Sequence, residues 1–282
     1  MVPLNIGGVP EHFNLPWLRL MESGALNDLG VAWRSVPEGS GAMAAALRAG
    51  DLDAAMLLTE GAVAGAAAGG FKIVSLYTTS PLIWGIHVPA ASDLHRVDDL
   101  RGRRYAISRR GSGSHLMSFV HAREWGWSTD DLDFVVVGTL QGAIDAFASG
   151  NADVFFWEKF MTKPLVDSGR FRRVGEFVAP WPAFVVCASN AALANDKPIG
   201  AALGRALDAA GELAASPSAA AAIADRYGLL PADAREWLSA TRWAARPGIE
   251  AEQIAPAVEQ LAALGLIGSD VAPHELTARL AS

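Results

Sequence analysis

The chain has 282 residues, of which 51% are hydrophobic and 19% are charged, so it is long enough for two domains with buried cores. Its 23 basic and 30 acidic residues leave a net charge of −7, which disfavours broad nucleic-acid binding because such binding requires many Lys and Arg side chains. A single cysteine, Cys187, excludes an internal disulfide and a cysteine-based zinc cluster.

The first residues lack the basic and apolar regions of a signal peptide. The most apolar stretch, residues 62–68, is far shorter than the roughly 20 residues that cross a membrane. The sequence as given therefore predicts a cytoplasmic protein without membrane insertion, or a periplasmic protein if a signal peptide has been removed.

Short apolar runs alternate with helical patterns through the first two-thirds of the chain. The first block predicts strand 4–7, helix 15–23, strand 31–36, helix 41–49, strand 54–57, helix 60–68 and strand 73–77. The second block predicts strand 104–108, helix 114–125, strand 134–137, helix 141–149 and strand 153–156. This rhythm, which occurs twice, predicts an α/β fold with two mostly parallel sheets.

Two β-rich runs, 83–88 and 184–188, join the blocks, and the chain becomes almost wholly helical after residue 189. Its helical patterns cover 199–215, 218–227, 231–240 and 252–264, and we expect these helices to pack on the first lobe. The predicted architecture has two lobes, residues 1–85 with 186–282 and residues 86–185. Two crossover strands link the lobes, and a ligand cleft lies between them.

Polar residues gather in loops that follow the predicted strands, where ligands of open α/β sheets bind. In the first lobe the candidate ligand-binding residues are Glu11, His12, Asn14, Ser40, Thr59 and Thr79. A carboxylate beside an imidazole is suited to orienting a polar ligand or moving a proton. The alternatives are an exposed His12 and helix-capping roles for Asn14, Ser40 and Thr59.

In the second lobe, Arg109, Ser112, Ser114 and His115 open a predicted helix. A serine cap leaves backbone N–H groups and the positive end of the helix dipole free, which favours a sulfonate, carboxylate or phosphate. The alternative is a simple cap with solvated arginines. Gln141 is a further candidate, and Glu158 either accepts a ligand donor or pairs with Lys159.

Three tryptophans lie beside the predicted strand ends or crossovers, at Trp84, Trp157 and Trp181. Each is a candidate for stacking on a planar or apolar ligand, and core packing is the alternative for each. Two such rings in the cleft would favour an organic ligand over a simple inorganic anion.

Neither a metal site nor a cofactor site is predicted. His87, His95, His121 and His274 have no metal-ligand spacing, and neither the dinucleotide fingerprint nor a Walker A sequence occurs. Cys187 falls in an apolar crossover strand, which is typical of an inert buried thiol.

The middle of the chain resembles type 2 periplasmic binding proteins, in particular the nitrate/sulfonate/taurine and thiamine-pyrimidine group of ABC-transporter substrate-binding proteins. The resemblance rests on residues 98–107 (DDLRGRRYAI), on 111–115 (GSGSH) and on 143–153 (AIDAFASGNAD). Residues 44–53 (AAALRAGDLD) repeat the last pattern in the first block, and the likeness covers about residues 3–190. The chain lacks the export signal of such receptors and the cysteine cluster of the thiamine-pyrimidine synthases.

This resemblance implies a Venus-flytrap fold that closes on one small molecule. We therefore expect a solute-binding protein for an anionic or heteroaromatic ligand of the sulfonate, carboxylate or pyrimidine class, without chemistry of its own. An ABC-transporter permease is the expected partner if the chain is exported. The alternatives are an enzyme on the same scaffold, similar to desulfinases or menaquinone-pathway enzymes, and a cytosolic ligand sensor.

Overall fold

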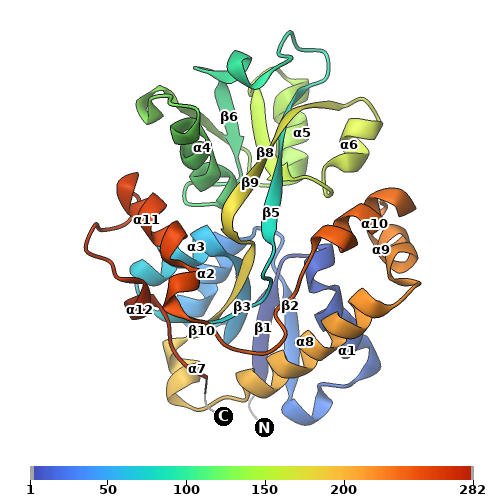
Figure 1. Cartoon of the computed structure of the whole chain (residues 1–282), viewed down its shortest axis with the longest axis vertical. Coiled ribbons are helices and arrows are strands. Elements are labelled where there is room, and N and C mark those ends of the chain that lie inside the picture. Colours follow the sequence, from blue (N-terminus) through green and yellow to red (C-terminus); the bar gives the residue numbers. More distant parts are fainter. Residues whose placement is uncertain (1–2, 281–282) are drawn as a thin grey trace. The chain divides into compact units, whose positions relative to one another are not determined.

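The computed structural model describes residues 3–280, which form two compact units (Figure 1). Unit 1 comprises the residues up to Pro81 and those from Pro180 onward, and unit 2 is Leu82–Ala179. Each unit contains one five-stranded mixed sheet with helices, which confirms the α/β fold class and the two β/α blocks. No helix in the described part of the chain has the length and apolar character needed to cross a membrane.

The sheet of unit 1 has the strand order β2-β1-β3-β10-β4. Its strands are β1 (Leu4–Gly8), β2 (Val31–Ser35), β3 (Ala54–Leu58), β4 (Phe71–Leu76) and β10 (Phe184–Ser189). Strand β1 is parallel to β2 and β3, whereas β10 is antiparallel to β3 and β4. The helices α1 (Leu15–Ser23), α2 (Ser40–Ala49) and α3 (Thr59–Ala67) follow β1, β2 and β3, so three loops leave the sheet at its carboxyl edge.

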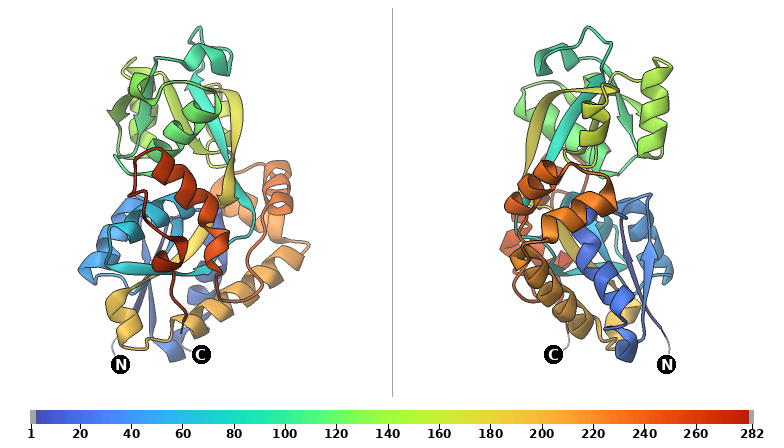
Figure 2. Two further views of the ribbon diagram at one scale, coloured as in Figure 1. Left: turned by 60° about the vertical axis from the view of Figure 1, so that its left-hand side comes forward. Right: turned by 90° about the vertical axis from the view of Figure 1, so that its right-hand side faces the viewer.

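The helical part of the chain after β10 belongs to unit 1, as predicted. It comprises α7 (Asn190–Ala194), α8 (Ile199–Ala215), α9 (Ala219–Tyr227), α10 (Pro231–Ala240), α11 (Ala255–Ala263) and α12 (Pro273–Leu276). Helix α8 packs against α1 (Figure 2). Its buried face includes residues at helical spacing, namely Leu203, Ala206, Leu207 and Ala210. Helix α11 packs against α3.

The sheet of unit 2 repeats this plan with the order β7-β6-β8-β5-β9. Its strands are β5 (Pro81–Pro89), β6 (Arg104–Ile107), β7 (Asp133–Val136), β8 (Val154–Glu158) and β9 (Phe171–Pro182). The helices are α4 (Gly113–Glu124), α5 (Leu140–Ala148) and α6 (Lys163–Asp167). Short 3-10 turns occupy His12–Asn14, Asn27–Leu29, Val97–Leu100, Thr129–Asp131 and Ala251–Gln253. The long edge strand β9 and the short helices α6, α7 and α12 are additions to the predicted elements.

The repeated sequence pattern has a structural explanation in two aspartates. Asp53 accepts a hydrogen bond from the backbone N–H of Asn5 at 2.8 Å, and Asp153 accepts one from the backbone N–H of Arg104 at 3.0 Å. Each carboxylate also binds a cation, since Lys197 Nζ lies 2.8 Å from Asp53 and the guanidinium of Arg104 binds Asp153 at 2.8 and 2.9 Å. In both units, the aspartate thus ties the start of one inner strand to its parallel neighbour.

Candidate functional site

The loop between β6 and α4 gathers three serines at the amino end of α4 in unit 2. Ser114 Oγ accepts a hydrogen bond from the backbone N–H of Ser108 at 3.1 Å and lies 3.1 Å from Ser112 Oγ and 3.4 Å from Ser108 Oγ. Ser112 Oγ also accepts from the backbone N–H of His115 at 3.4 Å, so Ser112 is the N-cap of the helix. The predicted cap is therefore present, and all three serines are buried.

The serine cluster has one more hydroxyl proton than its internal hydrogen bonds use. Each of the hydroxyls of Ser108, Ser112 and Ser114 carries one proton, and the cluster contains two hydroxyl–hydroxyl contacts. One O–H group therefore remains for another acceptor. Together with the backbone N–H groups in the first turn of α4, this makes the loop a source of hydrogen-bond donors, which suits an anion.

His115 adds a further donor at the same helix end. The backbone N–H of Gly111 donates to His115 Nδ1 at 3.0 Å, and because that N–H can only donate, Nδ1 is the acceptor and Nε2 carries the proton. No residue among 3–280 accepts from Nε2, although the side chain is only 7% exposed. Burial and the nearby positive charge of Arg110 lower the pKa of His115 to about 4, so the ring is uncharged near pH 7.

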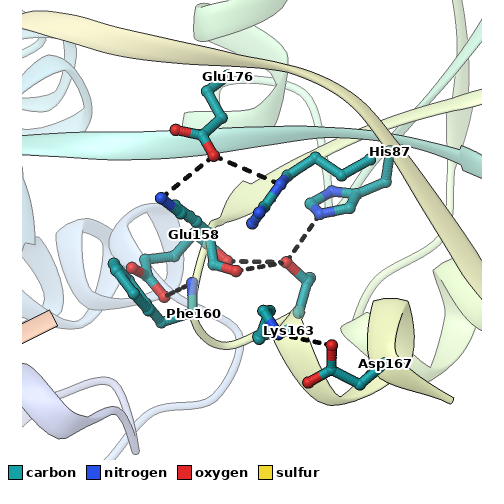
Figure 3. Close-up of polar contacts among 9 residues, drawn as sticks. His87, Glu158, Phe160, Lys163, Asp167 and Glu176 are labelled. Carbon is teal, nitrogen blue, oxygen red and sulfur yellow. Dashed lines mark hydrogen bonds and ion pairs between the residues drawn. The ribbon is translucent and has the colours of Figure 1, made fainter. Parts of the chain in front are cut away.

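Glu158 closes the loop that follows β8 in the same unit. Its Oε2 accepts hydrogen bonds from the backbone N–H groups of Phe160 at 2.9 Å and Met161 at 2.7 Å, as Figure 3 shows for Phe160. Lys159, the ion-pair partner considered from the sequence, lies 3.2 Å from Glu176. One carboxylate oxygen of Glu158 is therefore engaged in shaping the loop.

His87 supports this loop from strand β5, a role that sequence reasoning missed. Its Nδ1 lies 3.2 Å from the carbonyl oxygen of Phe155, which requires a proton on Nδ1, and Nε2 lies 2.9 Å from the hydroxyl of Thr162. Burial lowers the pKa of His87 to about 4. With Nδ1 protonated in the neutral ring, Nε2 accepts from Thr162, so the histidine holds β8 and the following turn together.

The remaining candidates of unit 2 lie on different elements. Trp84 is buried on β5, directly opposite Glu158 on β8, and Trp157 is half-buried with its ring stacked on Phe155 at 5.0 Å. Gln141 is exposed on α5, where its amide donates to Asp145 at 2.8 Å. Arg109 is half-buried beside the serine cluster. Arg109, the serines and His115 thus form one group, while Gln141 interacts with its own helix.

In unit 1, Ser40 and Thr59 occupy the ends of neighbouring loops at the carboxyl edge of the sheet. Ser40 Oγ accepts from the backbone N–H of Leu58 at 3.0 Å, which links the start of α2 to the end of β3. The hydroxyl of Thr59 donates to the carbonyl oxygen of Pro182, and its backbone N–H donates to that of Ala183 at 3.1 Å. Both side chains therefore have structural hydrogen bonds at this edge.

The loop after β1 packs its aromatic and imidazole rings inward. His12 is fully buried, with its ring 4.3 Å from that of Trp237 and 5.7 Å from that of Tyr227. Asn14 is also buried and donates from its amide nitrogen to the carbonyl oxygen of Val9 at 2.9 Å. Glu11 is half-buried at the start of the same 3-10 turn. The arrangement encloses His12 in a hydrophobic cluster.

Glu60 is a buried carboxyl group that sequence reasoning did not select, although it follows Thr59 directly. The indole N–H of Trp181 donates to Glu60 Oε2 at 3.0 Å, and both side chains are almost fully buried. Burial raises the pKa of Glu60 to about 7. Thr79 lies apart from this pair and is exposed, with its backbone N–H donating to the carbonyl oxygen of Arg242 at 2.8 Å.

The described residues contain no group of three or more His, Cys, Asp and Glu side chains placed to hold a metal ion. Cys187 is fully buried on β10, and burial raises the pKa of its thiol, which disfavours the nucleophilic thiolate. The chemistry on offer is therefore hydrogen bonding and charge, from the donor-rich α4 loop of unit 2 and from the acceptors at the carboxyl edge of unit 1.

Comparison with solved structures identifies the class of fold. The CA3427 gene product of Candida albicans, described as having the generic periplasmic binding protein fold, is 23% identical, with a TM-score of 0.88 over 100% of this chain and 98% of that one. The alkanesulfonate-binding protein SsuA of Xanthomonas axonopodis pv. citri, bound to MOPS, is 20% identical, with a TM-score of 0.79 over 99% of each chain. PhnD1 of Prochlorococcus marinus, in complex with methylphosphonate, is 14% identical, with a TM-score of 0.66 over 94% of this chain and 98% of that one.

The chain therefore has the fold of the periplasmic binding proteins, which confirms the resemblance inferred from its motifs. Within that fold, residues 84–177 match the family described as Ca3427-like PBP, so the match covers nearly all of unit 2. No curated protein matches the sequence.

Proposed function

We propose that the protein is a solute-binding protein whose ligand is a small organic anion of the sulfonate, carboxylate or related class. The observation that carries this proposal lies at the amino end of α4. There the neutral His115 has a buried Nε2–H donor for which no described residue provides a hydrogen-bond acceptor. A donor that is buried without an acceptor costs free energy, and an anionic ligand would remove that cost.

The surrounding groups strengthen the case for an anion. The serine cluster of Ser108, Ser112 and Ser114 has one hydroxyl proton beyond its internal contacts, and Arg109 and Arg110 precede the helix. A helix amino terminus carries a partial positive charge, which adds to the attraction. Neutral donors and arginine together are suited to a sulfonate or carboxylate over a wide range of pH.

Three of the groups that could carry out chemistry are poorly placed for it. Cys187 is fully buried with a raised thiol pKa, and one oxygen of Glu158 is held by two backbone N–H groups. His12 is enclosed by aromatic rings. General acid–base chemistry needs groups positioned to reach a substrate proton, and these three do not form such a set.

A thermal-shift screen tests the proposal. Alkyl and aryl sulfonates, carboxylates, pyrimidines and phosphorylated metabolites would be added to the protein, and each hit would be rechecked for turnover. A ligand at 100 times its dissociation constant adds about 2.7 kcal/mol, which corresponds to a shift of about 5–11 °C. A hit that is consumed, or a complete absence of hits, would contradict the proposal.

The site itself is tested with a double variant, Arg109→Ala with Ser114→Ala. We expect the affinity for an anionic hit to fall about tenfold or more, because a charge-assisted contact and the serine cluster are lost together. Arg123→Ala with Ser128→Ala is the matched control, since both residues are exposed on the same unit. Circular dichroism would check that both proteins fold, and unchanged affinity in the first variant would place the anion elsewhere.

Export and a permease partner remain predictions. Cell fractionation of the native protein would test them, because a permease partner requires the protein to be outside the cytoplasm. Recovery only from the cytoplasm would exclude this partner.

A further inference from the structure

Two buried oxygen acceptors lie in loops at the carboxyl edge of the unit 1 sheet. Glu60 Oε1 follows β3 and Asn14 Oδ1 follows β1, and each residue is 1% exposed. Neither oxygen receives a hydrogen bond from any residue between 3 and 280. In native proteins most buried polar atoms are paired, so two unpaired acceptors at one sheet edge require an explanation.

The orientation of both groups is set by their other hydrogen bonds. The indole N–H of Trp181 donates to Glu60 Oε2 at 3.0 Å, so this oxygen is engaged and Oε1 is the one left without a donor. The side chain of Asn14 donates through its nitrogen to the carbonyl oxygen of Val9 at 2.9 Å. Because a carbonyl only accepts, flipping the amide would place two oxygens together, so Oδ1 is the atom that lacks a partner.

The two loops border the same short segment of the chain. Strands β1 and β3 are parallel neighbours, paired at Ile6–Ala54 and Gly7–Ala55, so their carboxyl ends reach the same edge. The ring of Phe13, next to Asn14, packs against Phe184 at 4.8 Å. The backbone N–H of Thr59, next to Glu60, donates to the carbonyl oxygen of Ala183. Residues 183 and 184 therefore connect the surroundings of both acceptors.

We infer that unit 1 recognises an amino group, with Glu60 Oε1 as the principal acceptor and Asn14 Oδ1 in support, so that the solute is an organic amine. This inference rests on the proposed function and narrows the class of its ligand. A nitrogen that donates two or more hydrogen bonds supplies what both oxygens lack, whereas a hydroxyl supplies only one proton. Plain alkyl sulfonates and carboxylates supply none, so an amino group is the feature that unit 1 selects.

The electrostatics of Glu60 agree with this assignment. Burial raises the pKa of its carboxyl group, and a neighbouring ammonium group favours the ionised form in return. A charge-assisted hydrogen bond inside a buried site is stronger than one between neutral groups. The amine therefore gains more from Glu60 than from an exposed carboxylate.

Isothermal titration calorimetry with matched compounds tests the inference. Each pair differs only by an amino group: taurine against ethanesulfonate, γ-aminobutyrate against butyrate, and aminopyrimidine against pyrimidine. We expect the wild-type protein to bind the amino member of at least one pair about tenfold more tightly or better, as expected for a hydrogen bond to a charged group.

Glu60→Gln assigns the preference to its residue. Gln keeps the shape of Glu and accepts the Trp181 N–H through its oxygen, which places its own NH₂ where Oε1 was. The free acceptor becomes a donor, so the preference for the amino member should be lost while binding of the plain member changes less than about twofold. Glu212→Gln, on the exposed side of α8, removes the same charge and should keep the preference.

The outcomes separate this inference from the proposal on which it rests. No binding of any compound by the wild-type protein would overturn both. Binding without preference within any pair would overturn the amine inference alone and would indicate that water supplies the donor. A preference that survives Glu60→Gln in a folded variant would also overturn it. The wild-type comparison decides the question even if the variant does not fold.

Discussion

We expect His121→Leu to remove about a third of the acid sensitivity that the three buried histidines give unit 2. His121 lies on α4 and is 1% exposed, with its ring 5.0 Å from that of Phe156, 5.6 Å from Phe177 and 5.7 Å from Trp127. Neither ring nitrogen has a hydrogen-bond partner among the residues that the structure describes. Burial therefore lowers the pKa of His121 from 6.5 to about 4.

The sign of the effect follows from the two states. The unfolded chain accepts a proton on His121 near pH 6.5, whereas the folded protein resists protonation until about pH 4. Stability from this group is thus fully present above the unfolded pKa and is lost as the pH falls toward the folded pKa. The difference amounts to about 2 kcal/mol between about pH 7.5 and about pH 5, and to about 3 kcal/mol at full titration.

Urea unfolding at the two pH values, followed by tryptophan fluorescence, measures this difference. The wild-type protein should lose about 2 kcal/mol more than the variant between about pH 7.5 and about pH 5. His87 and His115 shift in the same direction, so the variant keeps a smaller acid sensitivity of its own. His95→Leu is the control, because His95 is exposed, and it should lose stability as the wild type does. Equal losses in wild type and His121→Leu would refute the reasoning.

Three further results are expected. Burial raises the pKa of Glu60 from 4.5 to about 7 in the folded protein, so this group lowers the free energy of unfolding as the pH rises through that range. Urea unfolding should therefore show Glu60→Gln to be up to about 3 kcal/mol more stable than wild type at alkaline pH, and a gain at acidic pH would contradict this. Gly142→Ala should cost about 1–3 kcal/mol, since its Cβ would meet the carbonyl oxygen of Val137, whereas Gly204→Ala, with open space, should cost nothing in the same thermal melts. Cys187 should react with a thiol reagent only after unfolding, and rapid labelling of the native protein would disprove its burial.

The fold was predictable because its signals are local. Alternating apolar runs and helical patterns indicated the β/α units. The repeated pattern of a glycine followed three positions later by an aspartate marked the start of β3 and β8, where Asp53 and Asp153 act. Strand β9 was not predicted because its apolar pattern is interrupted by Arg172, Arg173 and Glu176. It is an edge strand, where charged side chains are tolerated. The available sequence signal was the spacing of Phe177, Ala179 and Trp181 at every second position, and all three are buried.

The candidate site was harder to predict because its contacts join distant parts of the chain. The N-cap role of Ser112 follows from a pattern of a few residues, and it was found. Glu60 depends on Trp181, which lies 121 positions away, and nothing in the neighbouring sequence reports that contact. The tautomer of His115 depends on one backbone N–H, which a sequence pattern does not specify. The ligand contacts of the predicted residues stay predictions.

The position of β10 between β3 and β4 has a consequence for folding during synthesis. The sheet of unit 1 lacks one of its inner strands until Phe184–Ser189 has been made, although four of its five strands precede unit 2 in the chain. All five strands of unit 2 are complete by Pro182. Because synthesis proceeds from the amino end, nearly all of the unit 2 sheet is made before β10, the strand that pairs with both β3 and β4. The nascent chain must keep these two apolar edges unpaired throughout the synthesis of the intervening hundred or so residues, which makes that interval its most aggregation-prone stage.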